Sequence, residues 1–176
     1  MIRKLVSMIL ARANPWAAKQ KRAVQLQDRY GAWPCLFSAQ MTREQVRRAA
    51  EDPRLKEAEG LFREILAGGE GRIPPGAMAV TRHQLALLLH RQGRLAEAAE
   101  LYREVIAGCR LYAEPSETAD WVLCFALFRL AELTRPANAP EAAAMFAEAK
   151  EIAERRRYPD AIQMIARAVE YFGLGG

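Results

Sequence analysis

Apolar residues recur every three or four positions along most of the chain, with charged and small residues between them. This spacing is typical of amphipathic α-helices, because residues three and four apart lie on one face of a helix. The β-branched residues that favour strands are sparse. The pattern therefore predicts an all-α protein, with helices near residues 2–13, 16–29, 42–51, 54–68, 76–92, 95–109, 116–134, 140–157 and 159–172.

Part of this pattern is repeated. The twelve residues from Arg54 to Ile65 match those from Arg94 to Val105 at seven positions, with an offset of 40 residues. A third copy, Glu141 to Ala149, matches the second with an offset of 44 residues. Such self-similarity indicates structural units that stack on one another, because one unit alone cannot bury its apolar face.

An aromatic residue and a proline mark each repeat at the same distance. The aromatic residue is followed thirteen positions later by a proline in all three copies: Phe62 and Pro75, Tyr102 and Pro115, Phe146 and Pro159. Proline suits the first turn of a helix, where its missing N–H removes no intrahelical hydrogen bond. Each proline is therefore predicted to open a new helix.

The segment from Val80 to Ile106 resembles a tetratricopeptide repeat. The resemblance rests on small, large apolar and glycine residues at fixed places in two consecutive helices: Leu85, Ala86, Leu89, Gly93, Leu95, Ala98, Tyr102, Val105 and Ile106. Small alanines allow the paired helices to approach closely, and the glycine permits a left-handed turn between them. The recurring ring, Tyr102 in this unit, and the leucines are expected to be buried between neighbouring units. The likeness extends over roughly residues 42–172 and is most specific in this unit. The predicted helix 42–51 would open the first unit, although it carries few apolar residues.

The resemblance implies a short right-handed superhelical solenoid of helical hairpins. We expect residues 39–176 to form this repeat domain, with the last predicted helix, 159–172, as its cap, and residues 1–38 to form a basic helical arm. The repeats depart from the family, whose usual period is 34 residues. The surplus lies at residues 68–75 and 134–140, and insertions of this kind often form a binding rim.

In this family the first helix of each pair lines a concave groove that receives a peptide or helix of a partner protein. Transferred by motif position, the resemblance implies the groove residues His83, Leu87, His90, Arg91, Asp120, Leu123 and Leu127. The Lys, Asn and Arg clamp of chaperone-binding members is absent, since His83 and Leu87 occupy those places. A mixed apolar groove suits an amphipathic helix or an extended apolar segment. Leu123 and Leu127 fit equally well as core residues.

The net charge of +5 is concentrated at the N-terminus, because residues 1–50 carry ten Lys and Arg against Asp28 and Glu44. Apolar residues recur at helical spacing within the first ten positions, and basic residues lie between them. Such an arm either folds back to cover the end of the array or, through residues 1–30, contacts an anionic membrane surface or an acidic partner. The basic residues lack a stacking platform, which argues against nucleic acid.

No catalytic or cofactor site is evident from the sequence. His83 and His90 lie seven residues apart, too far for one metal ion on a helix, and no phosphate-binding loop is present. Cys35, Cys109 and Cys124 form no CxxC pair, which favours reduced thiols in a cytoplasmic protein, with membrane association left open. We therefore expect a non-catalytic adaptor or chaperone-like scaffold that uses no metal or cofactor. The alternatives are an inhibitor or immunity-type partner of an enzyme or toxin, and a membrane-surface assembly factor.

Overall fold

The computed structural model describes residues 15–31, 37–111 and 116–174, and this part of the chain is all-α. Every helix predicted within these residues is confirmed to within one residue at each end, whereas the predicted helix 2–13 lies outside them. The helices, with one short 3₁₀ turn, are α2 (Pro15–Tyr30), η1 (Ser38–Gln40), α3 (Arg43–Glu51), α4 (Pro53–Gly69), α5 (Pro75–Arg91), α6 (Leu95–Arg110), α7 (Glu117–Thr134), α8 (Ala139–Arg156) and α9 (Pro159–Phe172).

Local signals in the sequence explain where the helices begin. Pro75 and Pro159 are the first residues of α5 and α9, as predicted, whereas Pro115 lies outside the described residues. Ser116 caps α7, since its side chain accepts the N–H of Ala119 at 3.0 Å. Asn138 caps α8 in the same way. These caps satisfy backbone donors that have no partner within the helix.

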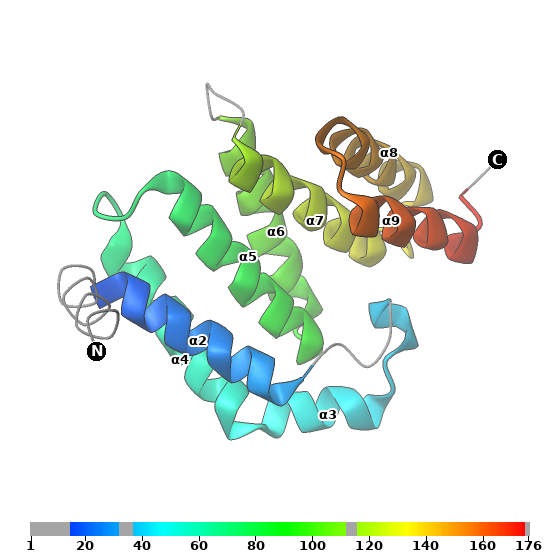
Figure 1. Cartoon of the computed structure of the whole chain (residues 1–176). Helices are drawn as coiled ribbons and strands as arrows, with labels where there is room; N and C mark the ends of the chain where they lie inside the picture. Colours follow the sequence, from blue (N-terminus) through cyan, green and yellow to red (C-terminus); the bar gives the residue numbers. More distant parts are fainter. Residues whose placement is uncertain (1–14, 32–36, 112–115, 175–176) are drawn as a thin grey trace.

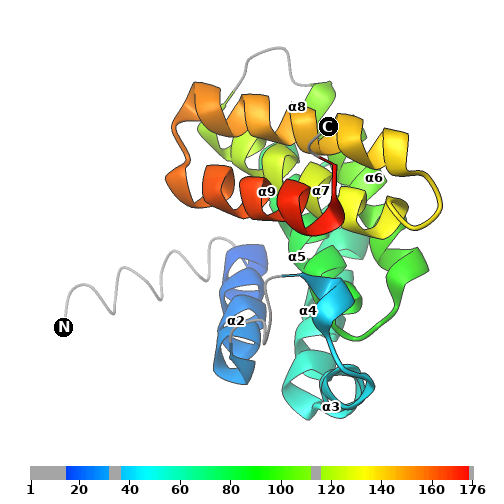
Figure 2. The ribbon, with the colours of Figure 1, turned by 90° about the vertical axis from the view of Figure 1, so that its right-hand side faces the viewer.

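Helices pack mostly against their neighbours in sequence (Figure 1). The two most regular pairs are α5 with α6 and α7 with α8, and α9 packs on α8. Seen from the side, α2 and α3 lie at one end of the molecule and α8 and α9 at the other (Figure 2). Along the chain, α5 also contacts α7, and α7 contacts α9, so the first helices of successive pairs are neighbours.

The partner of α4 differs from what the repeat pattern suggested. Helix α3 was expected to open the first unit, but it is short and contacts only part of α4. Helix α2, which the sequence assigned to the arm, packs along α4 instead, with Ala23 and Leu26 fully buried. The reason is physical: α3 buries only Ala49, which is too little apolar surface to cover α4.

The core is built from the same positions in three second helices. In α4, α6 and α8 an alanine and an aromatic residue one turn later are at most 1% exposed: Ala58 with Phe62, Ala98 with Tyr102, and Ala142 with Phe146. The predicted burial of the repeated aromatic residues is confirmed. An alanine next to a large ring lets a neighbouring helix approach closely while the ring fills the space between pairs.

The turn between α5 and α6 requires glycine. Gly93 has φ of +78°, and a Cβ built there would lie 2.6 Å from Cγ1 of Val46 on α3. We expect Gly93→Ala to lower the free energy of unfolding by about 2 kcal/mol, through left-handed backbone strain and this clash. Gly60→Ala is the matched control, because Gly60 lies within α4 with open space around it, and it should be neutral or stabilising. Urea unfolding measures both, and equal effects would contradict the assignment.

Candidate functional site

One side of α7 carries five residues that form what we call the α7 stripe: Thr118, Trp121, Phe125, Arg129 and Glu132. They are spaced by three or four residues, so they share a face of the helix. The ring of Trp121 lies 5.9 Å from that of His83, which places this face toward α5. The stripe begins with an aromatic half, where Trp121 is 39% exposed, and ends with a buried charged half.

The register of the first helices explains why sequence reasoning missed this stripe. Helices α5, α7 and α9 begin at Pro75, Glu117 and Pro159, a constant spacing of 42 residues (117 − 75 and 159 − 117). The prolines had suggested an offset of 40 residues, which points to Asp120, Leu123 and Leu127. Counted from the first residue of each helix, His83, Leu87 and His90 on α5 correspond to Phe125, Arg129 and Glu132 on α7.

The structure brings the two predicted histidines together around one tyrosine. His83 and His90 are each 1% exposed, and their rings lie 5.9 and 6.0 Å from that of Tyr102 on α6. The Tyr102 hydroxyl lies 3.4 Å from Nδ1 of His90. Burial, with a smaller contribution from the nearby Arg129 charge, lowers the pKa of each histidine to about 3. Both imidazoles are therefore neutral at pH 7.

Two charged residues predicted for the groove, Arg91 and Asp120, are buried and form polar contacts within the protein. Arg91 donates through Nη2 to the carbonyl of Gly31 at 2.9 Å and lies over the ring of Tyr30. Asp120 accepts from Nε of Arg156 at 2.6 Å, which ties the start of α7 to the end of α8. Both side chains are buried.

The three predicted leucines differ in exposure. Leu127 is 1% exposed and belongs to the core, in line with the alternative interpretation. Leu87 and Leu123 are half-buried and pack against the core. Of the seven predicted groove residues, these two alone keep a sizeable accessible surface, so a partner would meet the aromatic half of the α7 stripe before most of the predicted set.

The charged half of the stripe is a buried ion pair. Nη1 of Arg129 lies 2.6 Å from Oε2 of Glu132, and both side chains are at most one-tenth exposed. Burial raises the pKa of Glu132, although the attraction of Arg129 acts in the opposite direction. Removing one partner of such a pair is strongly destabilising, because the other charge is then buried without compensation.

An apolar pocket of about 540 Å³, which we call the α2–α5 pocket, adjoins the aromatic half of the stripe. It lies between the first turns of α2 and α5 and reaches Thr118 of α7. The ring of Trp16 forms one wall and is seated on α4 at Gly68, where a Cβ would come within 2.5 Å of the ring. The pocket is lined by Trp16, Ala17, Gln20, Lys21, Ile65, Ile73, Pro74, Gly76, Ala77, Val80, Thr81 and Thr118.

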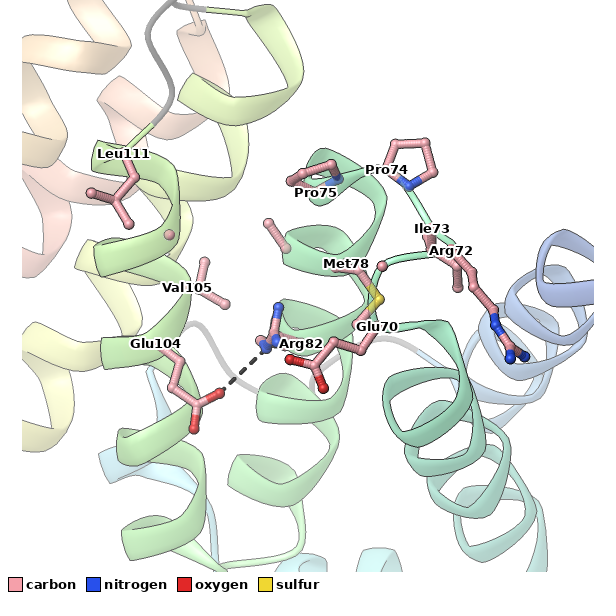
Figure 3. A pocket seen from close by; sticks show the side chains of 13 residues that line it. Glu70, Arg72, Ile73, Pro74, Pro75, Met78, Arg82, Glu104, Val105 and Leu111 are labelled. Carbon is pink, nitrogen blue, oxygen red and sulfur yellow. Dashed lines mark ion pairs between the residues drawn. The ribbon is translucent and has the colours of Figure 1, made fainter.

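A second pocket, of about 760 Å³, shares Ile73 and Pro74 with the α2–α5 pocket and extends to Leu111 of α6 (Figure 3). Arg82 of α5 and Glu104 of α6, which both line this pocket, form an ion pair with 3.3 Å between the charged groups. Because Glu70, Arg72 and this ion pair line it, the second pocket is a poorer receptor for an apolar side chain than the α2–α5 pocket, whose one charged lining residue among those described is Lys21. The inserted segment 68–75, predicted as a binding rim, contributes residues to both pockets.

The two cysteines that the structure describes are buried and free. Burial raises the pKa of the Cys109 thiol and raises that of Cys124 to about 12, so both are protonated at neutral pH. Cys35 lies outside the described residues. Within residues 15–31, 37–111 and 116–174, no cluster of three potential metal ligands occurs. None of the helices described there is both long and apolar enough to cross a bilayer.

Comparisons with protein-family models, with curated proteins and with solved structures give no match. The functional interpretation therefore rests on the geometry of the α7 stripe and the α2–α5 pocket.

Proposed function

We propose that this protein is a non-catalytic adaptor or chaperone-like scaffold that binds a segment of a partner protein on the surface formed by α2, α5 and α7. The observation that carries the proposal is the exposed side chain of Trp121, one helical turn after Thr118, the residue of α7 that lines the α2–α5 pocket. Aromatic side chains next to apolar pockets are typical of protein-binding surfaces, because a partner gains most when it desolvates such groups.

We further propose that the helices form a tetratricopeptide-like solenoid. Three features support this: the pairing of α5 with α6 and of α7 with α8, the 42-residue spacing of the first helices, and the repeated buried alanine and aromatic residues. In a solenoid of this kind, the first helices share one surface, and α5 and α7 carry both the pocket and the aromatic residues.

The partner segment is expected to present an apolar side chain and an acidic residue. On α2, Lys19 and Arg22 form ion pairs with Glu64 and Glu57 at 2.6 and 3.0 Å. Lys21, at the pocket edge, forms no ion pair with a residue that the structure describes. An acidic residue beside the inserted side chain would pair with it, and this contact would affect association rate and specificity more than affinity.

Filling the pocket should abolish binding. In affinity capture from the native source, we expect Ala77→Trp to fail to bind a protein that the unaltered chain binds. Ala77 lines the pocket, and the indole of the new tryptophan would fill it. Ala96→Trp is the matched control: Ala96 is exposed near the start of α6 and does not line the pocket. Mass spectrometry of the captured proteins identifies the partner as the protein lost only by Ala77→Trp.

The purified pair then tests the same site quantitatively. By calorimetry, Ala77→Trp should raise the Kd at least about tenfold, equivalent to 1.4 kcal/mol or more. Lys21→Glu should weaken binding less than Ala77→Trp does. Its effect should be larger at low salt, where charges on the surface are screened less. A partner that binds Ala77→Trp as tightly as the unaltered chain would exclude this pocket as its receptor.

A further inference from the structure

Residues 37 and 38, which precede α3, cover the end of the charged half of the α7 stripe at Glu132. The ring of Phe37 stacks on that of Tyr171, with centroids 4.9 Å apart, and lies 5.4 Å from that of Phe172. Ser38 donates its backbone N–H to Oε1 of Glu132 at 3.0 Å and its hydroxyl to the same oxygen at 3.4 Å. Residues 37 and 38 thereby contact both α7 and α9.

The segment has the features of a bound peptide. Its backbone is extended at Phe37 (φ −116°, ψ 143°), makes the single turn η1, and is extended again at Met41 (φ −70°, ψ 130°). Phe37, at 3% exposed, is the only buried side chain among residues 37–42. One aromatic anchor with main-chain hydrogen bonds beside it is a common mode of peptide recognition.

Release of this segment would leave no buried charge alone. Glu132 keeps Arg129 as its partner at 2.6 Å, and the Ser38 donors return to water. Tyr171, Phe172 and Glu132 contact residues 37 and 38 and form what we call the Phe37 site. Tyr171 is already 51% exposed. The contact can therefore open without the penalty that accompanies an uncompensated buried charge, and its main cost is the exposure of Phe37 and of the Phe172 ring that it covers.

The Phe37 site also continues the surface proposed for the partner. Trp121 and Phe125, with ring centroids 4.7 Å apart, lie on the same stripe as Arg129 and Glu132. One half of the stripe is open, and the other is filled by the chain itself. A partner segment that follows the stripe from the α2–α5 pocket would reach the place that Phe37 and Ser38 occupy.

We propose that the Phe37 site is a receptor for an extended protein segment with an aromatic side chain, which residues 37–40 occupy in cis and release to a partner segment of the same chemistry. The biological use of this exchange rests on the proposed function, but the site itself does not. Because a tethered segment acts at an effective concentration on the order of 1 mM, a free segment competes only if it is also held elsewhere. The α2–α5 pocket would provide that second contact.

The first test uses the unaltered protein and hydrogen–deuterium exchange. If the segment opens locally, the amides of residues 37–41 should exchange at least tenfold faster than those in the middle of α7, after correction for intrinsic rates. Exchange as slow as in α7 would overturn the proposal, because the segment would then be released only with global unfolding.

The second test supplies the segment in trans. The probe is a fluorescein-labelled peptide with the sequence of residues 31–42, with serine in place of Cys35, and binding is followed by fluorescence anisotropy. Phe37→Ala should bind this peptide at least tenfold more tightly than the unaltered protein, because its own anchor is removed. Adding Tyr171→Ala to Phe37→Ala should abolish the gain, and a peptide with Phe37→Ala should not bind. Circular dichroism verifies that each variant is folded.

Equal binding of the peptide to Phe37→Ala and to the unaltered protein would contradict the proposal. So would tight binding that survives Tyr171→Ala, since the peptide would then be bound elsewhere. Neither test uses the unidentified partner or the α2–α5 pocket, so a negative result here leaves the proposed function standing, and the Ala77→Trp experiment can fail independently.

Discussion

Between pH 7.5 and pH 5.0 the two buried histidines are expected to lower the free energy of unfolding by about 4 kcal/mol. Burial lowers the pKa of His83 and of His90 to about 3 in the folded protein, compared with about 6.5 in the unfolded chain. At pH 5.0 the unfolded chain therefore binds nearly one proton at each histidine, and the folded protein binds almost none. The loss of stability begins as the pH falls through 6.5 and reaches about 2 kcal/mol per histidine at pH 5.0. Above pH 7.5 the histidines make no difference to stability.

Denaturant unfolding at the two pH values measures this effect. Glu132 acts in the opposite direction, because a raised carboxyl pKa stabilises the folded state as the pH falls, and it offsets part of the loss. His83→Phe should remove about half of the dependence on pH while the helical content stays unchanged. The same stability at pH 7.5 and 5.0 would show that the histidines are accessible to protons in the folded state.

Tyr102→Ala is expected to lower the free energy of unfolding by about 3–5 kcal/mol. Tyr102 is fully buried and lies between both histidines, so its removal opens a cavity where α5 and α6 meet α7. Tyr102→Phe retains the ring and loses only the hydroxyl beside His90, which should cost about 1 kcal/mol.

The comparison of the two variants separates packing from hydrogen bonding. Thermal and urea unfolding at pH 7.5, where the histidines are neutral, provide the measurement. Equal losses for Tyr102→Ala and Tyr102→Phe would mean that the hydroxyl, and not the ring, holds these helices together. A loss below about 1 kcal/mol for Tyr102→Ala would contradict a central position for this ring.

The helices could be predicted closely because their signals are local. Helical periodicity, the caps at Ser116 and Asn138, and the first-turn prolines Pro75 and Pro159 all act within a few residues of the boundary that they set. The burial of Tyr102 was predicted for a related reason: a large ring repeated at the same place in each unit marks the side that neighbouring units cover.

The site depends on contacts that no local pattern records. The predicted offset of 40 residues selected Leu123 as the counterpart of His83, whereas an offset of 42 selects Phe125. The two side chains lie on different faces of α7, because successive residues are rotated by about 100° around a helix. Ser38 and Glu132 are 94 positions apart. The position of α2 beside α4 depends on which helix buries more apolar surface, and a sequence pattern gives no direct measure of that.

The central claim is that the partner binds at the open half of the α7 stripe and the adjoining pocket. The most direct measurement is photocrosslinking in the native source, with benzoylphenylalanine placed at Val80, at Trp121 or, as a control, at the exposed Leu95 on α6. The account predicts that one and the same protein is crosslinked from Val80 and Trp121 and not from Leu95. Crosslinks to that protein from Leu95 alone would place the binding surface elsewhere and contradict the account.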